Sequence, residues 1–436
     1  MIFLRLVLSV GAFTTIAAAA EQADVVRAMQ LARDAATAAQ DKDYPSYLAK
    51  MEAAIALRSD IPRMRVNLAA AQVANDRADE AIATLERLAA LGLSSPVEKS
   101  PDFTPLRGRK DFDAVVKKLA ANMHPKGNGQ TAFALREVSG LIEGIAWREK
   151  TGEFYFGDVN GRAVRTKNKD GILRRFTPEG NDLFGVFGLA VDEARAALWV
   201  ATSAVPAMRG FTPDQDGTAA LAEIDLETGV VRRTIPVVRQ TGDQQSHVLG
   251  DLSLADDGSV FVTDSGAPVL WRLGPGESAL VPWVESPEFI SLQGMVILPG
   301  GGAIVSDHAN GLLHVNLQNR SVRRLEPPPN RTLVGLDGLA LSMDGSVLAI
   351  QNGLRPNRVL RIMLDPRENT VTAVTVLESG HITMAAPSLG CIATDGDFFF
   401  IGNAGWTRFE EAEGRPTGTR SVPIFKTQLG AEKLKH

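Results

Sequence analysis

One short phrase recurs six times after residue 140 of this 436-residue chain. In each copy a glycine-containing pair opens an apolar run, a turn follows, and a second β-rich run ends the phrase. The copies begin at Glu143-Gly144, Phe187-Gly188, Gly250-Asp251, Gln293-Gly294, Asp337-Gly338 and Leu389-Gly390. They are spaced by about 40 to 60 residues, the period of four-stranded propeller blades. The sequence therefore predicts a mainly β fold, a six-bladed β-propeller over residues 132–428.

The bends and the ends of this segment can also be assigned. Asp257-Gly258 and Asp344-Gly345 stand between paired apolar runs, where a tight hairpin turn is expected. Residues 133–138 and 422–426 are both β-like, one before the first blade and one after the last. Pairing them in one blade would remove the open strand edges, so we expect the ring to close this way.

Residues 21–123 predict a separate helical domain. They are rich in Ala, Leu, Glu and Arg, and apolar residues recur at helical spacing. A 34-residue shift aligns Leu48 with Ile82, which together with Asn67-Leu68-Ala69 resembles a tetratricopeptide repeat. Such a stack either holds a peptide or protein partner in its groove or shields one side of the propeller. Residues 124–131 read as a Pro- and Gly-containing linker between separable domains.

The first 20 residues predict a signal peptide. Arg5 precedes an apolar stretch, Leu6 to Ile16, and a run of alanines follows at 17–20. The alternative is a membrane anchor, but the apolar stretch is short for a span of roughly 20 residues. We therefore expect a periplasmic or secreted protein with no membrane span after cleavage, and a short tail at 429–436.

Charge and cysteine content exclude other classes. The formal net charge is −5 and there is no basic cluster, which argues against a nucleic-acid partner. The single cysteine, Cys391, cannot form an internal disulfide, and its apolar setting predicts a buried, inert thiol.

Polar residues are expected to gather at one mouth of the propeller channel. Inner strands begin and second strands end at the same rim, so Glu143, Gln293 and Asp337 would meet there. These side chains offer the carboxylate and amide oxygens that Ca²⁺ prefers. Asp251 adds another oxygen if its strand is bulged. The alternative is that such residues only bind local backbone at turns and strand ends.

The run from Ala132 to about Phe425 resembles the sugar-lactone lactonase superfamily, which includes gluconolactonases and senescence marker proteins. The resemblance lies in residues 141–144, 251–258, 262–265 and 337–340. It implies a divalent cation, usually Ca²⁺, held by a first-blade Glu, by mid-ring Asn residues and by a later Asp. Glu143 and Asp337 match the acidic ligands. Gln293 replaces one Asn, and Gly250, followed by Asp251, stands where the other is expected.

The resemblance also implies a reaction, hydrolysis of a lactone whose carbonyl the metal polarises. Asp264 or Asp337 would take a proton, and His308 is the histidine expected at this face from a strand end. Asn352 and Asn403 are expected to contact ligand.

Two functional hypotheses follow. The first is an exported, metal-dependent hydrolase of a lactone or small ester; the second is a non-catalytic propeller that binds a ligand or a protein. The retained acidic ligands favour the first hypothesis. Gly250 and the attached helical domain favour the second.

Overall fold

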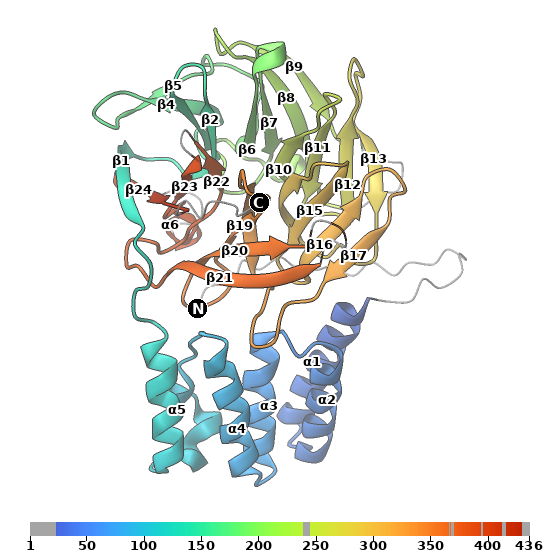
Figure 1. The fold of residues 1–436 in the computed structure, drawn as a ribbon, viewed down its shortest axis with the longest axis vertical. Coiled ribbons are helices and arrows are strands. Elements are labelled where there is room, and N and C mark those ends of the chain that lie inside the picture. The colour runs from blue at the N-terminus through green and yellow to red at the C-terminus, as the bar shows by residue number, and fades with distance from the viewer. Residues whose placement is uncertain are drawn as a thin grey trace.

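The computed structural model describes residues 23–238, 245–365, 367, 370–393, 396–411 and 416–429. The predicted signal peptide and nearly all of the predicted tail lie outside these residues. The remainder forms a ring of six four-stranded sheets with helices on one side of it (Figure 1). The predicted six-bladed propeller is therefore confirmed.

Each of the first five blades is one continuous stretch of chain with its strands in sequence order from the channel outward. Blades 1 and 2 contain β2 (Ile142–Arg148), β3 (Glu153–Asp158), β4 (Ala163–Lys167) and β5 (Leu173–Arg175), then β6 (Gly185–Asp192), β7 (Ala197–Ser203), β8 (Ala219–Asp225) and β9 (Val231–Pro236). Blade 3 contains β10 (Leu249–Leu254), β11 (Val260–Asp264), β12 (Val269–Leu273) and β13 (Val281–Glu285). Blades 4 and 5 contain β14 (Leu292–Ile297), β15 (Gly302–Asp307), β16 (Gly311–Asn316) and β17 (Val322–Leu325), then β18 (Leu336–Leu341), β19 (Val347–Gln351), β20 (Arg358–Leu364) and β21 (Val371–Ser379).

The sixth blade joins the two ends of the propeller. It contains β22 (Gly390–Ile392), β23 (Phe398–Ile401), β24 (Arg420–Thr427) and, outermost, β1 (Gln130–Val138). β1 runs antiparallel to β24, with Leu135 opposite Val422. The expected closure of the ring is confirmed, and β1 begins inside the segment assigned to the linker.

Apolar side chains fill the spaces between neighbouring blades. Six buried clusters each combine residues of two adjacent blades, such as Phe156 of blade 1 with Ile401 of blade 6. The predicted bends are also present, because Gly258 and Gly345 have φ of +86° and +80° between paired strands. These positive values are why glycine is needed at the two turns.

The repeated glycine of the opening phrase lets the inner strands crowd around the channel. A Cβ on Gly144 would lie 1.9 Å from the carbonyl oxygen of Phe187 in the next blade. A Cβ on Gly294 would lie 2.5 Å from the amide nitrogen of Leu339, again one blade further. The glycine therefore keeps the ring tight at the rim where the candidate residues begin.

This crowding leads to a stability prediction. Gly144→Ala should lower the free energy of unfolding by about 3 kcal/mol or more, because the backbone of blade 2 must move. Chemical denaturation measures the loss. Gly250→Ala is the control, since its nearest neighbour is the rotatable Ser265 hydroxyl at 3.1 Å. Equal losses for the two variants would contradict this account.

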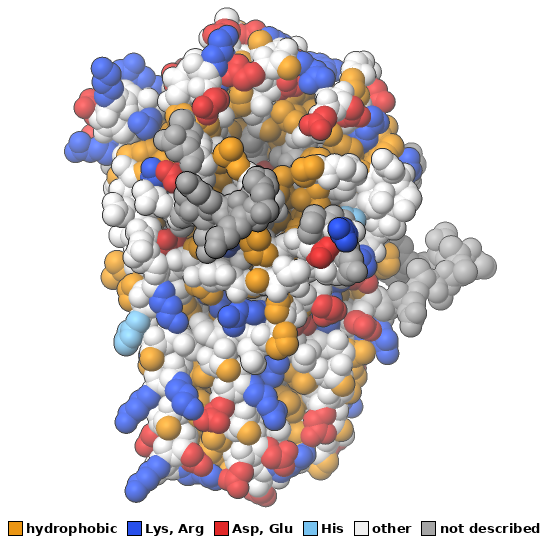
Figure 2. Space-filling view, viewed as in Figure 1, with side chains coloured by type: hydrophobic (Ala, Val, Ile, Leu, Met, Phe, Trp, Pro, Cys, Tyr) orange, Lys and Arg blue, Asp and Glu red, His pale blue; other side chains and the backbone are white. Residues whose placement is uncertain are grey.

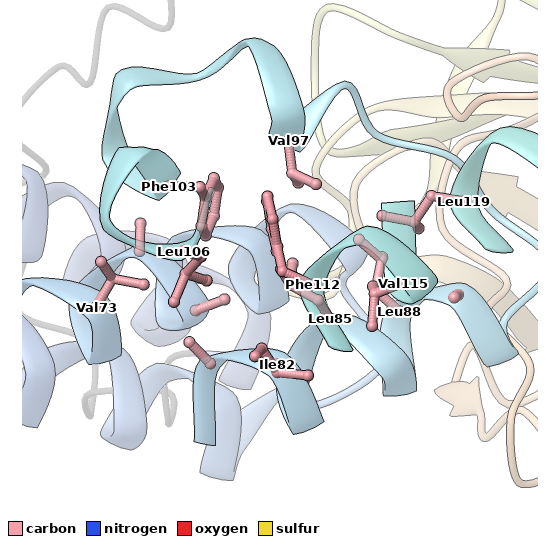
Figure 3. Packing of buried hydrophobic residues seen from close by; sticks show 14 of the residues in the cluster. Val73, Ile82, Leu85, Leu88, Val97, Phe103, Leu106, Phe112, Val115 and Leu119 are labelled. Atoms are coloured by element: carbon pink, nitrogen blue, oxygen red, sulfur yellow. The ribbon is translucent and has the colours of Figure 1, made fainter. Parts of the chain in front are cut away.

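The helical domain is a stack of antiparallel helices, α1 (Asp24–Gln40), α2 (Tyr44–Leu57), α3 (Pro62–Ala74), α4 (Ala78–Ala90) and α5 (Lys110–Ala121). Two 3₁₀ segments, Val97–Lys99 and Pro101–Leu106, lie between α4 and α5. α2 and α4 begin 34 residues apart, as the sequence shift predicts. Phe103 and Phe112 pack on Leu85 and Leu88 at the closing end (Figure 3). The tetratricopeptide character remains an interpretation.

The remaining observations concern hydrophobic helices and surface charge. Among the described residues, no helix is long and apolar enough to cross a membrane. Figure 2 shows Lys and Arg interspersed with Asp and Glu over the helices, as on a solvated surface.

Candidate functional site

Strand register places the two expected residue sets at one rim. Ile142 pairs with Asp158, Leu249 with Asp264, Leu292 with Asp307, and Leu336 with Gln351. In each of these blades the start of the inner strand therefore lies beside the end of the second strand. A register shift follows at once in every one of these inner strands, at the positions of Glu143, Gly250-Asp251, Gln293 and Asp337. Such bulges re-aim side chains at the rim of a sheet.

Glu143 is a buried carboxylate at the start of blade 1, with 9% of its surface exposed. Its Oε2 accepts a hydrogen bond of 2.7 Å from Trp406 Nε1, and its carbonyl accepts one from the Ser388 hydroxyl. Burial and the nearby charge of Asp337 raise the pKa of Glu143 well above its usual range, against the Trp406 bond. The charges of Glu143 and Asp337 therefore influence each other, although the two residues come from blades 1 and 5.

Asp337, Asn352 and His308 form a connected polar group beside Glu143. Asn352 Nδ2 donates to Asp337 Oδ2 and, at 2.8 Å, to the carbonyl of Pro387. The side chains of Asn352 and Asp337 also lie near His308 and act on its pKa. Burial raises the pKa of Asp337, although His308 and Asn352 oppose the shift. Burial lowers the pKa of His308, although Asp337 and Asn352 oppose it, so the imidazole favours its neutral form.

Asp251 and Gln293 occupy the rim between these blades in different ways. Gln293 stands at the same repeat position as Glu143 and Asp337, and its Nε2 donates to Ser291 Oγ at 3.1 Å. Asp251 stands one position later, where the other blades have glycine. Its Oδ2 accepts from the Met295 amide of blade 4 at 3.3 Å. The bulge that the sequence argument required is present, and Asp251 fills the gap between two blades.

The three rim carboxylates lack the usual cationic partners. Within the described part of the chain, Glu143, Asp251 and Asp337 form no ion pair with lysine or arginine. Buried charges without partners are costly, so such acids hold their protons or bind another cation. Burial, assisted by the charge of Asp337, raises the pKa of Asp251 to about 7 against two backbone hydrogen bonds.

These raised pKa values predict how stability depends on pH in metal-free protein. The folded-state pKa of Asp251, about 7, exceeds the unfolded value, so its contribution is complete below about pH 4 and is lost as the pH rises through 7. The free energy of unfolding should fall between pH 5 and 8, with an upper bound of about 3 kcal/mol from this residue, because about two pH units of that window lie below its folded-state pKa.

Urea denaturation at pH 5 and pH 8 measures this difference. Asp251→Asn should flatten the dependence, while the exposed neighbouring Asp256→Asn should leave it intact. An unchanged slope in Asp251→Asn would exclude this residue as the cause.

Asp264 lies apart from this group. Its side chain is fully buried and accepts backbone hydrogen bonds from Val248, Gly266 and Ala267. It also bonds His247 Nδ1 at 2.7 Å and Trp271 Nε1 at 3.1 Å. The equivalent Asp307 of blade 4 accepts four backbone amides in the same manner. This repeated use indicates a structural role, so we do not retain Asp264 as proton acceptor in the proposed site.

Asn403 and Trp406 lie in blade 6. Asn403 bridges Ala386 through its backbone, and its carbonyl accepts from Arg420. Trp406 opens α6 (Trp406–Glu411), and its ring stacks on Phe187 at 6.2 Å between centroids. The contact of Trp406 with Glu143 was not predicted, because no sequence pattern links two residues so far apart in the chain.

The donor set suits one class of metal ion. Among the described residues, no three His, Cys, Asp or Glu side chains lie close enough together to hold a metal, which is unlike a zinc site. Ca²⁺, in contrast, is completed by amide and water oxygens. Glu143 and Asp337 each engage one oxygen in the side-chain hydrogen bonds described above, and their two charges would balance a divalent cation. The residues present therefore fit Ca²⁺ held by two carboxylates.

No family model and no curated protein matches the chain. Among solved structures, a gluconolactonase from Xanthomonas campestris is 16% identical, with TM-score 0.46 over 67% of this chain and 88% of its own. A streptogramin B lyase is 13% identical, with TM-score 0.44 over 67% and 96%. A PQQ-bound aldose sugar dehydrogenase from Streptomyces coelicolor is 12% identical, with TM-score 0.44 over 69% and 98%. At these identities and TM-scores the likeness carries no statement about activity.

Proposed function

We propose that this protein is a metal-dependent hydrolase of a lactone or small ester, with its site at the channel mouth. The observation that carries the proposal is the pair Glu143 and Asp337, two buried carboxylates that interact and have no Lys or Arg partner in the described chain. Glu143 and Asp337 would hold Ca²⁺, with Gln293 at the equivalent strand position of blade 4. When bound, the ion would polarise the substrate carbonyl.

The protein's own residues supply the proton transfer. His308 favours its neutral form, so it takes a proton from the water whose oxygen bonds to the carbonyl carbon. The bond from that carbon to the leaving oxygen then breaks, and His308 returns the proton to that oxygen. Asn352 contacts both His308 and Asp337 and therefore fixes their orientation. Trp406, stacked on Phe187, would limit access of water from the side of blade 6.

Acid release from sugar δ-lactones and from small esters, followed with a pH indicator, tests this activity. We expect hydrolysis that a chelator stops and Ca²⁺ restores. His308→Gln should lower kcat by about 100-fold, the effect of losing a general base. His124→Gln, an exposed histidine near the domain junction, is the control and should retain full activity.

The hydrolysis assay also distinguishes this proposal from the non-catalytic hypothesis. A protein that binds Ca²⁺ yet hydrolyses none of these substrates would be a non-catalytic ligand- or protein-binding propeller. The non-catalytic hypothesis is favoured by Gly250, which offers no side-chain ligand at the position where the resemblance implies an Asn.

Localisation and partners are further parts of the proposal. The leader-like residues 1–20 support export to the periplasm or secretion, and the helical domain would hold a peptide or protein partner. The net charge and the mixed-sign helical surface give no support for nucleic acid.

A further inference from the structure

The helical domain contacts the same rim of the propeller that carries the candidate site. The loops that follow β15 and β19 begin beside the inner-strand starts of blades 4 and 5. Both loops also touch helical residues: Asn310 contacts Arg58, and Arg355 accepts from the Ser94 amide at 2.8 Å. Figure 1 shows β20 and β21 directly above the helices. The domain junction and the channel mouth therefore share two loops.

The first link runs through Arg58 at the end of α2, of which only 1% is exposed. Arg58 Nε and Nη2 bind both carboxylate oxygens of Asp60 at 2.8 and 2.9 Å. Arg58 Nη1 donates to Asn310 Oδ1 at 2.6 Å, and Nη2 to the Asn310 carbonyl at 3.1 Å. Asn310 is two residues from His308 in the short turn between β15 and β16. A charged, fully buried group of the helical domain thus holds the turn that carries His308.

The second link runs through Arg358, which begins β20 and is 3% exposed. Its Nη1 donates to the carbonyl of Leu91, at the C-terminal end of α4, at 2.9 Å. Its Nε and Nη2 donate to Gln351 Oε1 at 2.8 and 2.5 Å. A cation at a helix C-terminus is favourable because unpaired carbonyls gather there. Gln351 precedes Asn352, which binds Asp337, so α4 is tied to the second half of the site.

An ion pair and a cavity lie beside the first link, where Arg324 Nη1 of the propeller pairs with Asp60 Oδ2 at 3.3 Å. A cavity of about 430 Å³ lies there, lined by helical residues including Arg58 and Asp60 and by propeller residues including Asn310 and Arg324. Leu354, from the β19–β20 loop, packs against the helical core. Docking on this side therefore combines buried polar contacts with the packing of Leu354.

We propose that Arg58 and Arg358 are positioning residues through which the helical domain sets the geometry of the channel mouth. This inference rests on the proposed function, because it assumes that the channel mouth binds the cation and that His308 transfers the proton. Arg58 fixes the His308 turn, and Arg358 fixes Gln351 and hence Asn352 against Asp337. A partner that shifts α2 or α4 would consequently change cation affinity at the mouth without touching it.

Calorimetric titration of metal-free full-length protein with CaCl₂ tests the inference. Arg58→Met and Arg358→Met should each raise the Kd for Ca²⁺ by about tenfold, the scale of coupling through positioning residues. Arg148→Met is the matched control. Arg148 is equally buried at 3% exposure and is paired with Glu193 at 2.8 Å, but it lies at the far end of β2. The Arg148→Met variant should be less stable than wild type and should keep the wild-type Kd for Ca²⁺.

Hydrogen exchange of residues 308–311 and 352–357 supplies a readout that does not need Ca²⁺. Exchange should be faster in both junction variants and unchanged in Arg148→Met. If Arg58→Met does not fold, Asn310→Ser removes the Oδ1 acceptor of Arg58 Nη1 and so weakens the same link, while the Arg58–Asp60 pair and the bond from Arg58 Nη2 to the backbone carbonyl stay in place. Equal Kd values and equal exchange in all variants would overturn the inference. If wild-type protein binds no Ca²⁺, the proposed function fails, and the exchange comparison alone decides whether the helical domain positions these loops.

Discussion

Ca²⁺ added to chelated protein should raise its melting temperature, and Glu143→Gln should remove most of the rise. The two buried carboxylates repel each other without a cation, and burial raises the pKa of each. A ligand that binds only the folded state stabilises it by about 2.7 kcal/mol at a hundredfold excess over Kd. For a domain of this size that corresponds to roughly 4 °C. Differential scanning calorimetry with a chelator and then with excess CaCl₂ measures the shift.

The control for this experiment lies in the same blade. Glu153→Gln removes an exposed carboxylate at the start of β3 and should respond to Ca²⁺ as wild type does. A calcium response that survives in Glu143→Gln would place the ion elsewhere. No response in wild type would leave the carboxylates to share protons instead, and would favour the non-catalytic hypothesis.

Asp337→Asn and Asp264→Asn should have opposite effects on metal-free protein. Asp337→Asn removes a buried charge that acts unfavourably on Glu143 and Asp251 and has no Lys or Arg partner among the described residues, so the metal-free protein should gain stability at pH 8 while activity is lost. Asp264→Asn places an amide where a carboxylate accepts hydrogen bonds from three backbone amides, His247 and Trp271. It should cost about 3 to 5 kcal/mol.

Urea denaturation of the chelated proteins and the lactone assay together distinguish the structural role of Asp264 from the functional role of Asp337. Asp264→Asn, where it remains folded at low temperature, should keep measurable hydrolysis, whereas Asp337→Asn should show none. Loss of activity in Asp264→Asn at full stability would restore Asp264 as proton acceptor. A large loss of stability in Asp337→Asn would show that its carboxylate serves the fold.

The repeat in the sequence was sufficient to predict the ring. Alternation within strands and tight turns between them are local signals, and the chain repeats these signals in six copies. The same repeat aligned Glu143, Gln293 and Asp337, because equivalent positions in a closed ring face one axis. Closure by residues near 133 and 424 followed from the need to pair open strand edges.

Contacts between distant segments were decided only by the tertiary structure. Trp406 and Glu143 are 263 residues apart, and Arg58 and Asn310 are 252 apart, so no periodicity links them. In the sequence, Asp264 and Asp337 are both acidic residues near a terminus of a predicted strand. One is surrounded by amide donors of its own loops, and the other faces a channel beside a second carboxylate. Local pattern sets where a side chain stands on its strand, but the environment that fixes its charge and role comes from the blades and helices packed around it.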